Sequence, residues 1–390
     1  MEASGVTAIA LSGPDLTESE IVAVSDVLRS SRLSLGAKLP EFERKVAEYV
    51  GCRHAVAVNS GTSALHLIVR SLGIGEGDEV ITTPFSFVAS ANCLLYERVK
   101  PVFVDIDESA LNLDCDLIER AITEQTRAIL AVDVFGLPAD WSRLQEIARA
   151  HSLALIEDSC EALGARYRLR DGRWAMAGSL ADAGAFAFYP NKQITTGEGG
   201  MIVTDREDIA RLCRSMRNQG RDEGAGWLQH SRLGFNYRLS DINCALGIAQ
   251  IERLDGILAA RNRVAEWYGE LLAEVAEVQA PRPYPGAEIS WFVYVVRLAD
   301  GFGRADRDRI LRGLRDRGIA CSNYFSPIHL QPFYREMYAY QEGSFPVTES
   351  ISARTIVLPF FNRLTEEQVQ RVVSTLKEEI ARLGPARACG

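Results

Sequence analysis

One lysine in this sequence stands in an apolar setting directly before a glycine-rich turn. Lys192 lies in FAFYPNKQITTGEGGMIVT, residues 186–204, whose composition indicates short strands and a tight loop. Burial among apolar groups disfavours the charged form of a lysine, and the neutral amine can then form an imine with a carbonyl compound. Because most lysines are solvated, a surface role is the alternative.

A carboxylate stands at the end of an apolar run. Asp158 closes LALIED, residues 153–158, which is typical of a β-strand. Open parallel sheets bind ligands at the carboxyl ends of their strands. At such a place Asp158 could keep a pyridine nitrogen protonated, so that the charged ring accepts electrons from a substrate carbon. Capping of a following helix is the alternative role.

Small polar residues at the start of a predicted helix suggest a phosphate site. The segment NSGTSALHL, residues 59–67, follows the apolar run AVAV. The backbone amides of Gly61, Thr62 and Ser63, together with two hydroxyl groups, can hold a dianionic phosphate at the positive end of a helix. A plain helix cap would need only one of the three residues.

An aromatic residue follows the next predicted strand. Phe87 lies in TPFSFVASAN, residues 83–92. Its ring could lie against a planar heteroaromatic ring in an offset stack. Core packing is the commoner role of a phenylalanine, so Phe87 supports a ligand site only in combination with the groups above.

The order of predicted elements indicates how these residues are positioned. Short β-rich runs alternate with helical stretches and lie at residues 55–58, 79–83, 101–106, 128–134 and 153–158. This alternation predicts an α/β protein with a mainly parallel sheet covered by helices on both faces. A helix is predicted at 17–30, where Thr17 and Glu20 have capping-box spacing. The glycine-rich segment at 73–78 precedes a strand, whereas a dinucleotide fingerprint follows one, so a turn is predicted there.

The C-terminal third of the chain has a different pattern. A long helical pattern runs from about residue 246 to 272 and is broken by PRPYPG at 281–286. An apolar strand at 290–298 and helices at 305–317 and 365–383 follow. We therefore predict a large ligand-binding domain at 1–245 and a smaller α/β domain at 246–390.

Composition narrows the class of partner. The chain of 390 residues has 52 acidic and 43 basic side chains and a net charge of -9, which argues against nucleic acid as a partner. The eight cysteines and five histidines show no metal-like spacing, so no metal site is expected. Neither a signal peptide nor an apolar run long enough for a membrane span is found, and a cytoplasmic protein is expected.

The chain resembles the DegT/DnrJ/EryC1/StrS family of sugar aminotransferases in segments that follow one another in the family's order. These segments are GTSALHL, GDEVITTPFSF, PVFVDID, IEDSCEALGA, FYPNKQITTGEGG and LGFNYRLSDINCALGIAQIERL. The resemblance covers roughly residues 10–380, and the lysine segment is its most specific part. It implies the aspartate-aminotransferase-like fold, known as fold type I, and pyridoxal 5'-phosphate (PLP) as cofactor.

The resemblance implies a role for each matching residue. Lys192 would carry PLP as a Schiff base, Asp158 would bind the pyridine nitrogen, and Phe87 would stack on the ring. The phosphate would be held by Gly61, Thr62 and Ser63, where the segment at 59–67 opens a helix. Family members form homodimers with shared active sites, so Asn236, in GFNYR, would reach the phosphate of the neighbouring subunit.

Some positions depart from the family or are less certain in role. Many members carry a serine where this chain has Ala187, so one phosphate contact is missing. Glu161 stands where glutamine or histidine is frequent, near the ring hydroxyl. Three further residues are candidates for contacts to the amino donor or the sugar, namely Tyr324, Arg238 and His329. His329 lies in SPIHLQPFY, and its alternative role is to cap or bridge the smaller domain.

The resemblance also implies a reaction. L-Glutamate would donate its amino group, Lys192 would act as base, and a nucleotide-linked keto sugar would receive the amine. The segments EALGA and FYPNKQITTGEGG resemble the perosamine-synthase-like branch, which acts at C4 of a 4-keto-6-deoxy sugar for amino-sugar and surface polysaccharide biosynthesis. An aminotransferase for a C3 keto sugar or a keto-inositol of antibiotic biosynthesis stays open, as does a regulator that binds PLP without catalysis. A dehydratase with the same cofactor would carry histidine in place of Lys192.

Overall fold

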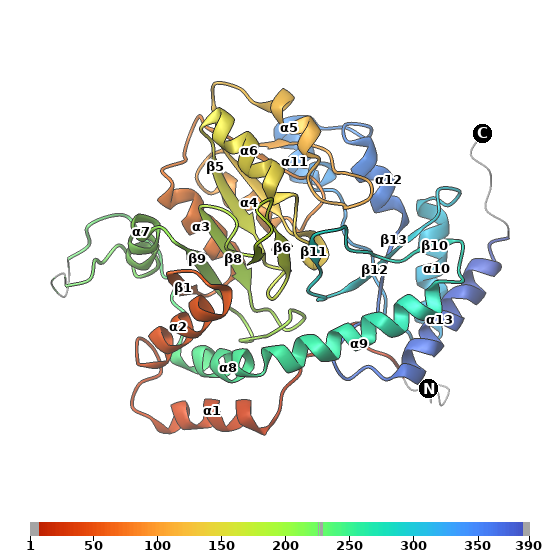
Figure 1. Cartoon of the computed structure of the whole chain (residues 1–390), viewed down its shortest axis with the longest axis horizontal. Coiled ribbons are helices and arrows are strands. Elements are labelled where there is room, and N and C mark those ends of the chain that lie inside the picture. The colour runs from red at the N-terminus through yellow and green to blue at the C-terminus, as the bar shows by residue number, and fades with distance from the viewer. Residues whose placement is uncertain (1–7, 225, 227–228, 385–390) are drawn as a thin grey trace.

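A seven-stranded sheet forms the centre of the protein (Figure 1). The structure is a computed structural model, and it describes residues 8–224, 226 and 229–384. The strand order is β1-β9-β8-β5-β4-β2-β3. The strands are β1 (His54–Val58), β2 (Glu79–Thr82), β3 (Lys100–Phe103), β4 (Thr126–Val132), β5 (Ala154–Asp158), β8 (Ala183–Ala187) and β9 (Gly200–Thr204).

The sheet is parallel apart from one strand. β9 pairs antiparallel with both β1 and β8, whereas the β8–β5, β5–β4, β4–β2 and β2–β3 pairs are parallel. The mainly parallel sheet predicted from the sequence is confirmed. The lysine segment contributes β8 and β9, and the loop between these two strands carries Lys192.

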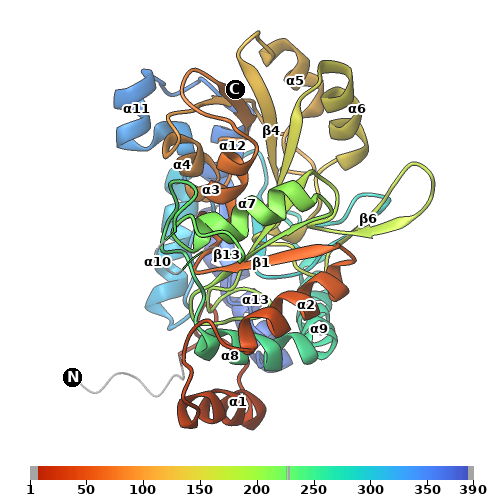
Figure 2. The same ribbon diagram turned by 90° about the vertical axis from the view of Figure 1, so that its left-hand side faces the viewer.

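Helices cover both faces of the sheet (Figure 2). Successive side chains of a strand point to opposite faces, and the side chains on both faces are apolar. In β1, Val56 and Val58 pack in one buried cluster with residues of α3 (Gly61–Ser71) and α7 (Glu207–Arg217). Ala55 and Ala57 pack in another with residues of α2 (Lys38–Val50) and α8 (Asp241–Glu252). Central strands buried on both faces are typical of parallel sheets. The helices of this part are α1 (Glu18–Arg29), α2 (Lys38–Val50), α3 (Gly61–Ser71), α4 (Ala89–Leu95), α5 (Cys115–Ala121), α6 (Trp141–His151) and α7 (Glu207–Arg217).

The C-terminal part forms a second layered unit around a three-stranded sheet of order β10-β12-β13. Its strands are β10 (Val278–Gln279), β12 (Tyr294–Leu298) and β13 (Thr355–Leu358). Its helices are α10 (Arg304–Asp316), α11 (Pro332–Tyr338), α12 (Pro346–Arg354) and α13 (Glu366–Ala381). A third small sheet joins the hairpin β6 (Arg166–Arg168) and β7 (Trp174–Met176) to β11 (Ala287–Glu288).

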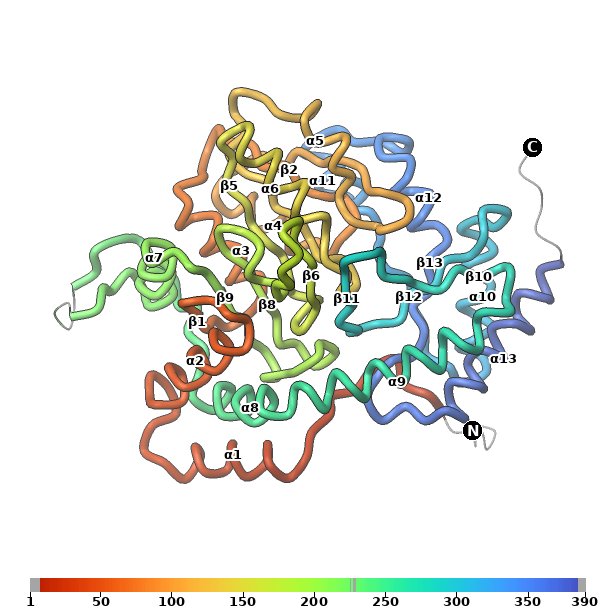
Figure 3. Tube along the Cα trace, viewed as in Figure 1, coloured from red at the N-terminus to blue at the C-terminus, as the bar shows by residue number. Residues whose placement is uncertain are grey.

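Two consecutive helices connect the two parts (Figure 3). The sequence predicted one long helical pattern from residue 246, but the structure divides it into α8 (Asp241–Glu252) and α9 (Leu254–Leu272). Arg253, between them, leaves helical geometry and forms ion pairs with Asp15 and Glu20. Because α9 contributes Ile257 to one buried cluster and Tyr268 to the C-terminal cluster, it belongs to both parts. The domain division at residue 245 stays a prediction.

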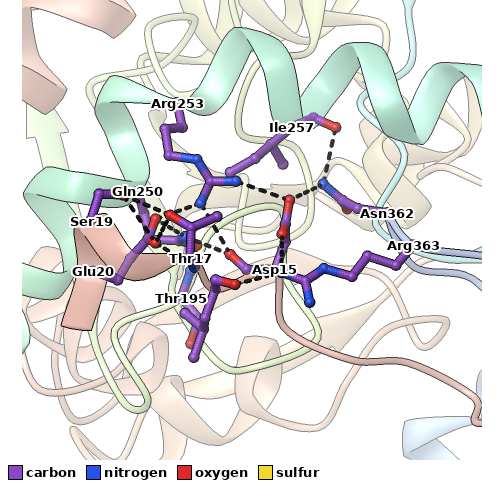
Figure 4. Close-up of polar contacts among 11 residues, drawn as sticks. Asp15, Thr17, Ser19, Glu20, Thr195, Gln250, Arg253, Ile257, Asn362 and Arg363 are labelled. Carbon is purple, nitrogen blue, oxygen red and sulfur yellow. Dashed lines mark hydrogen bonds and ion pairs between the residues drawn. The ribbon is translucent and has the colours of Figure 1, made fainter.

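A polar network ties the N-terminal segment to this helix pair (Figure 4). The predicted capping pair is present, because the Thr17 N–H donates to the Glu20 carboxylate at 2.7 Å. Glu20 also accepts from Gln250 and Arg253, and these bonds lower its pKa to about 2 against the opposing effect of burial. Asp15 accepts from Arg253 and from residues 362 and 363 of the C-terminal part.

The described part of the chain, residues 8–224, 226 and 229–384, contains neither a membrane-spanning helix nor a metal cluster. No helix there is long and apolar enough to cross a bilayer. No group of three or more histidine, cysteine or acidic side chains within those ranges could hold a metal ion.

Candidate active site

A cavity of about 740 Å³ opens where the parallel strands of the central sheet end. Its lining includes seven of the residues predicted to form the site, which come from five separate segments. They are Gly61, Thr62, Phe87, Asp158, Glu161, Lys192 and Tyr324. The parallel strands bring these segments together because their carboxyl ends meet at one edge of the sheet.

Lys192 projects an amine into this cavity between an acid and an aromatic ring. Its Nζ lies 3.6 Å from Oε1 of Glu161 and 4.1 Å from the centre of the Phe292 ring. The side chain is largely buried. A primary amine over a ring face and beside a carboxylate is held by two electrostatic attractions.

Asp158 is held by hydrogen bonds on both carboxylate oxygens. It is 4% exposed, and its Oδ2 accepts from Ser90 Oγ at 2.6 Å while Oδ1 accepts from the Cys160 N–H at 3.2 Å. Ser90 Oγ also lies 2.8 Å from Ser86 Oγ. Because the single hydroxyl proton of Ser90 goes to Asp158, Ser86 must donate to Ser90. The two hydroxyls therefore hold the Asp158 side chain in place.

Glu161 is a second buried acid on the cavity wall. Burial raises its pKa, and the opposing charge of Lys192 and the hydrogen bond from the Phe135 N–H reduce that effect. The Phe135 N–H donates to Oε2 at 2.9 Å, which leaves Oε1 facing the amine of Lys192. A carboxyl group whose pKa is raised can hold a proton near neutral pH more readily than an exposed glutamate.

The N-terminus of α3 forms another wall of the cavity. Gly61 is required there, because an added Cβ would lie 2.7 Å from the Cβ of Ala187 and 2.8 Å from Sγ of Cys160. The free amides and positive end of an eleven-residue helix favour an anion at this place. Ala187 also lines the cavity and has no hydroxyl to offer, as the sequence indicated.

Ser63, Asn236, Arg238 and His329 were also predicted site residues, and the structure does not place them on the cavity wall. The Ser63 hydroxyl donates to Asn59 at 2.7 Å and its N–H donates to the capping hydroxyl of Ser60, so Ser63 serves the start of the helix. These two bonds explain why Ser63 does not face the cavity.

Two of these residues lie together on the surface of the subunit. Asn236 is exposed, and its backbone pairs with Asn218. Arg238 donates to the side-chain oxygen of Asn218 at 3.0 Å. Within a single chain, neither residue reaches the cavity.

His329 is fully buried in the C-terminal part. Its Nε2 lies 3.0 Å from Glu349, and its ring packs edge-on against Phe345. Burial lowers its pKa, against the opposing effect of Glu349. This contact matches the alternative in which His329 bridges the smaller part of the chain, and its substrate role stays a prediction.

Several cavity residues were missed at the level of sequence. Ser86 and Ser90 lie in the segment from which only Phe87 was selected, and Gln331 and Phe333 lie in the segment from which only His329 was selected. The first segment was singled out because it follows a predicted strand, and the second because it resembles a motif of the family. Which side chain of each segment faces the cavity depends on the local backbone, which periodicity alone does not determine.

Comparisons with known proteins agree with this geometry. The model of the DegT/DnrJ/EryC1/StrS aminotransferase family matches residues 14–377. GDP-perosamine synthase of Caulobacter vibrioides is 38% identical over 379 residues, covering 96% of this chain and 99% of that protein. A protein of Geobacillus stearothermophilus named pleiotropic regulatory protein is 35% identical over 364 residues, which cover 92% of this chain and 94% of that protein.

A solved structure has the same fold. The structure of Spr1654 from Streptococcus pneumoniae in its PLP form superposes with a TM-score of 0.91 at 28% identity, covering 97% of this chain and 100% of that one. Fold and cavity together define a PLP-dependent sugar aminotransferase. The chain belongs to the DegT/DnrJ/EryC1/StrS aminotransferase family. The family, fold and cofactor predicted from the sequence are thereby confirmed.

The residues of the cavity fit this cofactor. An amine, a buried carboxylate and the amide end of a helix line one cavity, and the aldehyde, pyridine nitrogen and phosphate of PLP require these three kinds of group. Phe87 also lines this cavity and is 62% exposed.

Proposed function

We propose that this enzyme transfers the amino group of L-glutamate to the keto group of a nucleotide-linked sugar, with Lys192 as the residue that holds PLP covalently. The observation that carries this proposal is the placement of Lys192 and Asp158 on one cavity with the N-terminus of α3. Each supplies a group that the cofactor needs, and the three come from distant parts of the chain.

The cofactor, when bound, supplies an aldehyde that condenses with amines and a ring that stabilises negative charge on the adjacent carbon. The protein supplies the proton chemistry. Nζ of Lys192, when free, accepts the proton from the α carbon of glutamate. Glu161, 3.6 Å away, stabilises the ammonium that results.

Asp158 keeps the cofactor ring in its electron-accepting form. An anionic carboxylate next to the pyridine nitrogen favours the protonated ring. The hydrogen bonds from Ser90 and Cys160 orient this carboxylate and stabilise its charge. Asp158 therefore acts at the nitrogen while Lys192 acts at the reacting carbon.

The sugar is proposed to be a 4-keto-6-deoxy sugar aminated at C4. The similarity to GDP-perosamine synthase supports this choice, and so do the EALGA and FYPNKQITTGEGG segments. A C3 keto sugar and a keto-inositol are the competing substrates. The similarity to a protein named as a regulator favours a second candidate function, in which the chain binds PLP without turnover.

Visible absorbance spectroscopy distinguishes a transaminase from a regulator that binds PLP without turnover. The purified yellow protein is mixed with L-glutamate, and its visible absorbance is followed. A transaminase loses the band of the lysine-bound cofactor and forms pyridoxamine phosphate, whereas a regulator keeps the band. Lys192→Ala serves as the control that should form no pyridoxamine phosphate, because it lacks the proposed base. An unchanged wild-type spectrum at high glutamate would exclude the proposed donor reaction.

A substrate panel then decides the acceptor. The pyridoxamine form is mixed in turn with GDP-, dTDP- and UDP-linked 4-keto-6-deoxy sugars, with a 3-keto sugar and with a keto-inositol. Recovery of the lysine-bound band reports amination, and NMR of the product identifies the carbon. Recovery with the 3-keto sugar or the inositol alone would overturn the C4 assignment.

We also propose that the active site is completed in a homodimer. Asn236 is exposed and does not reach the cavity of its own chain, so its predicted phosphate contact requires a second subunit. Lys192→Ala and Asn236→Asp subunits are each expected to be inactive alone. A 1:1 mixture that exchanges subunits should recover up to about a quarter of wild-type activity, because about half of its dimers are mixed and each mixed dimer has one intact site of two. Activity that never rises on mixing would contradict the shared site.

A further inference from the structure

A buried arginine outside the cavity holds the backbone of Lys192. Arg261, on α9, is 3% exposed. Its Nη2 donates to the Lys192 carbonyl at 3.0 Å, and its Nη1 donates to the carbonyls of Phe292 at 3.2 Å and Trp291 at 3.3 Å. One planar guanidinium thus connects the lysine loop to the segment that enters β12.

The buried charge of Arg261 has no ion-pair partner among the described residues. Among the residues that the structure describes, no carboxylate lies within ion-pair distance of Arg261, and its Nε has no hydrogen-bond partner. Burial lowers its pKa to about 10, with only the charge of Asp15 opposing. The ring of Phe360, 5.7 Å from Cζ, gives partial compensation. Burying such a cation costs stability that a neutral side chain would not cost.

The same guanidinium fixes both partners of one contact in the cavity. The ring of Phe292 faces Nζ of Lys192 at 4.1 Å, and Arg261 binds the main-chain carbonyl of each of these two residues. The position of the amine relative to the ring is therefore set by bonds to a single rigid group. A lysine in place of Arg261 has no planar fork to span these carbonyls.

Neighbouring side chains hold the rest of the loop. Gln250 on α8 accepts from the Thr195 N–H at 3.2 Å and donates to Glu20 at 2.8 Å (Figure 4). The side chain of Gln193 donates to the carbonyl of Glu161 at 2.7 Å. With residues 193 and 195 anchored in this way, Arg261 supplies the bond to the main-chain carbonyl of residue 192 itself.

We propose that Arg261 is a positioning residue of the reaction: by binding the carbonyls of Lys192 and Phe292 it sets where the Lys192 amine lies. This inference rests on the proposed role of Lys192. A displacement of about 1 Å at a reacting group can cost roughly a hundredfold in rate. Loss of Arg261 therefore slows the proton transfer at the donor carbon and leaves the walls that contact the sugar unchanged.

Two variants and one matched control test this role. Arg261→Lys keeps the charge and loses the planar fork. Arg261→Gln loses the charge, can still donate to one carbonyl, and avoids the cost of a buried cation, and thermal unfolding checks that it is folded. Arg307→Lys is the control, because Arg307 is 5% exposed and donates to the carbonyls of Ser352 and Thr355 within the C-terminal part.

The first measurement is the single-turnover rate with L-glutamate. Both Arg261 variants should lose about tenfold or more in this rate, while the KM for the sugar changes by less than about twofold. Arg307→Lys should change neither quantity by more than about twofold. An unchanged rate in both Arg261 variants overturns the proposal, and so does an equal loss in Arg307→Lys.

The second measurement needs no bound cofactor. The apoenzyme is treated with trinitrobenzenesulfonate over a range of pH, and peptide mapping gives the rate at Lys192 relative to the exposed Lys100 and Lys377. In the Arg261 variants the rate of the trinitrobenzenesulfonate reaction at Lys192 should change by about threefold or more at some pH, while the rates at Lys100 and Lys377 stay unchanged. Identical profiles in wild type and variants overturn the proposal.

Failure of the proposed function is recognised separately. Borohydride reduction of the wild-type holoenzyme, followed by peptide mapping, should label Lys192. A label on a different residue overturns the function proposed for Lys192, whatever the apoenzyme profiles show. A label on Lys192 with unchanged Arg261 variants overturns only the positioning role.

Discussion

The two sides of the cavity are held in different ways. On the side proposed to bind the cofactor, Asp158 and Glu161 are buried, and hydrogen bonds from Ser90 and two backbone amides fix them. Phe333, at the start of α11, lines the same cavity and is 40% exposed, and we propose that this part of the wall binds the sugar. The fold therefore fixes the two acids that act in the chemistry, while the aromatic residues Phe87 and Phe333 stay accessible.

This difference follows from what each side must do. Groups that stabilise developing charge act best when they are already oriented, because reorganisation during the reaction costs free energy. Aromatic side chains that bind a sugar gain most of their contact area only when the ligand arrives. Substitutions on the first side should change the rate of chemistry, and those on the second should change substrate affinity.

The largest effect is expected for Lys192→Ala. Loss of the amine removes both the covalent anchor and the proposed base, so turnover should fall by about four orders of magnitude or more. Thermal unfolding of the apoenzyme should change little, because the aliphatic stem of Lys192 only lines the cavity. Activity assays and calorimetry provide the two readouts. Substantial remaining turnover would show that the cofactor side does not depend on this residue.

A smaller loss is expected when the charge at the ring nitrogen is removed. Asp158→Asn keeps the shape of the side chain and should reduce the rate by roughly a hundredfold or more. Ser90→Ala, which removes one bond to Asp158, should cost about tenfold, and Ser90→Thr should restore the rate because it keeps the hydroxyl. Stopped-flow measurement of the glutamate reaction checks all three. Equal rates in the two Ser90 variants would contradict the proposal that the Ser90 hydroxyl supports Asp158 in the reaction.

The substrate side should respond in affinity rather than in rate. Phe333→Ala should raise the KM for the sugar about threefold to tenfold and leave the single-turnover rate with glutamate within about twofold. Phe333→Tyr, which keeps the ring, is the matched variant and should bind normally. A loss in the glutamate reaction would mean that the two sides are not separate.

An effect on stability rather than on the reaction is expected from a buried acidic pair, Asp133 and Glu157. Ser159 Oγ donates to Asp133 at 2.6 Å and lies 2.9 Å from Glu157. Burial raises the pKa of Asp133 to about 6 against the hydrogen bond from Ser159, and burial and the charge of Asp133 raise the pKa of Glu157. Folded acids with raised pKa values bind more protons than the unfolded chain. The stabilising contribution of Asp133 is therefore complete below about pH 4 and is lost as pH rises through about 6, and that of Glu157 is lost as pH rises through its own raised pKa.

Urea unfolding of the apoenzyme between pH 4 and 8 tests this sign. Asp133→Asn should flatten the decline of stability with rising pH by an amount on the order of 1–3 kcal/mol. Asp171→Asn changes an exposed acid and is the control, with no comparable flattening expected. A wild-type stability that rises steadily from pH 4 to 7 would contradict the prediction.

The amino-acid sequence by itself determined the class of fold and the main chemical groups. Apolar runs at strand spacing predicted the parallel strands, and Asp158 could be placed at a strand end because that position follows from the run before it. Lys192 was recognisable because its apolar and glycine-rich surroundings are local. These features can be recognised from residues that are close together in the sequence.

Only the tertiary structure decided which residues support Asp158 and Lys192. Ser90 lies 68 positions from Asp158, and Arg261 lies 69 positions from Lys192, so no local pattern links the members of either pair. The break between α8 and α9 and the burial of His329 likewise depend on Asp15, Glu20 and Glu349, which reach these places through the packing of separate segments. Hydrogen-bond partners are chosen by distance in space, and that distance exists only after the helices have packed on the sheet.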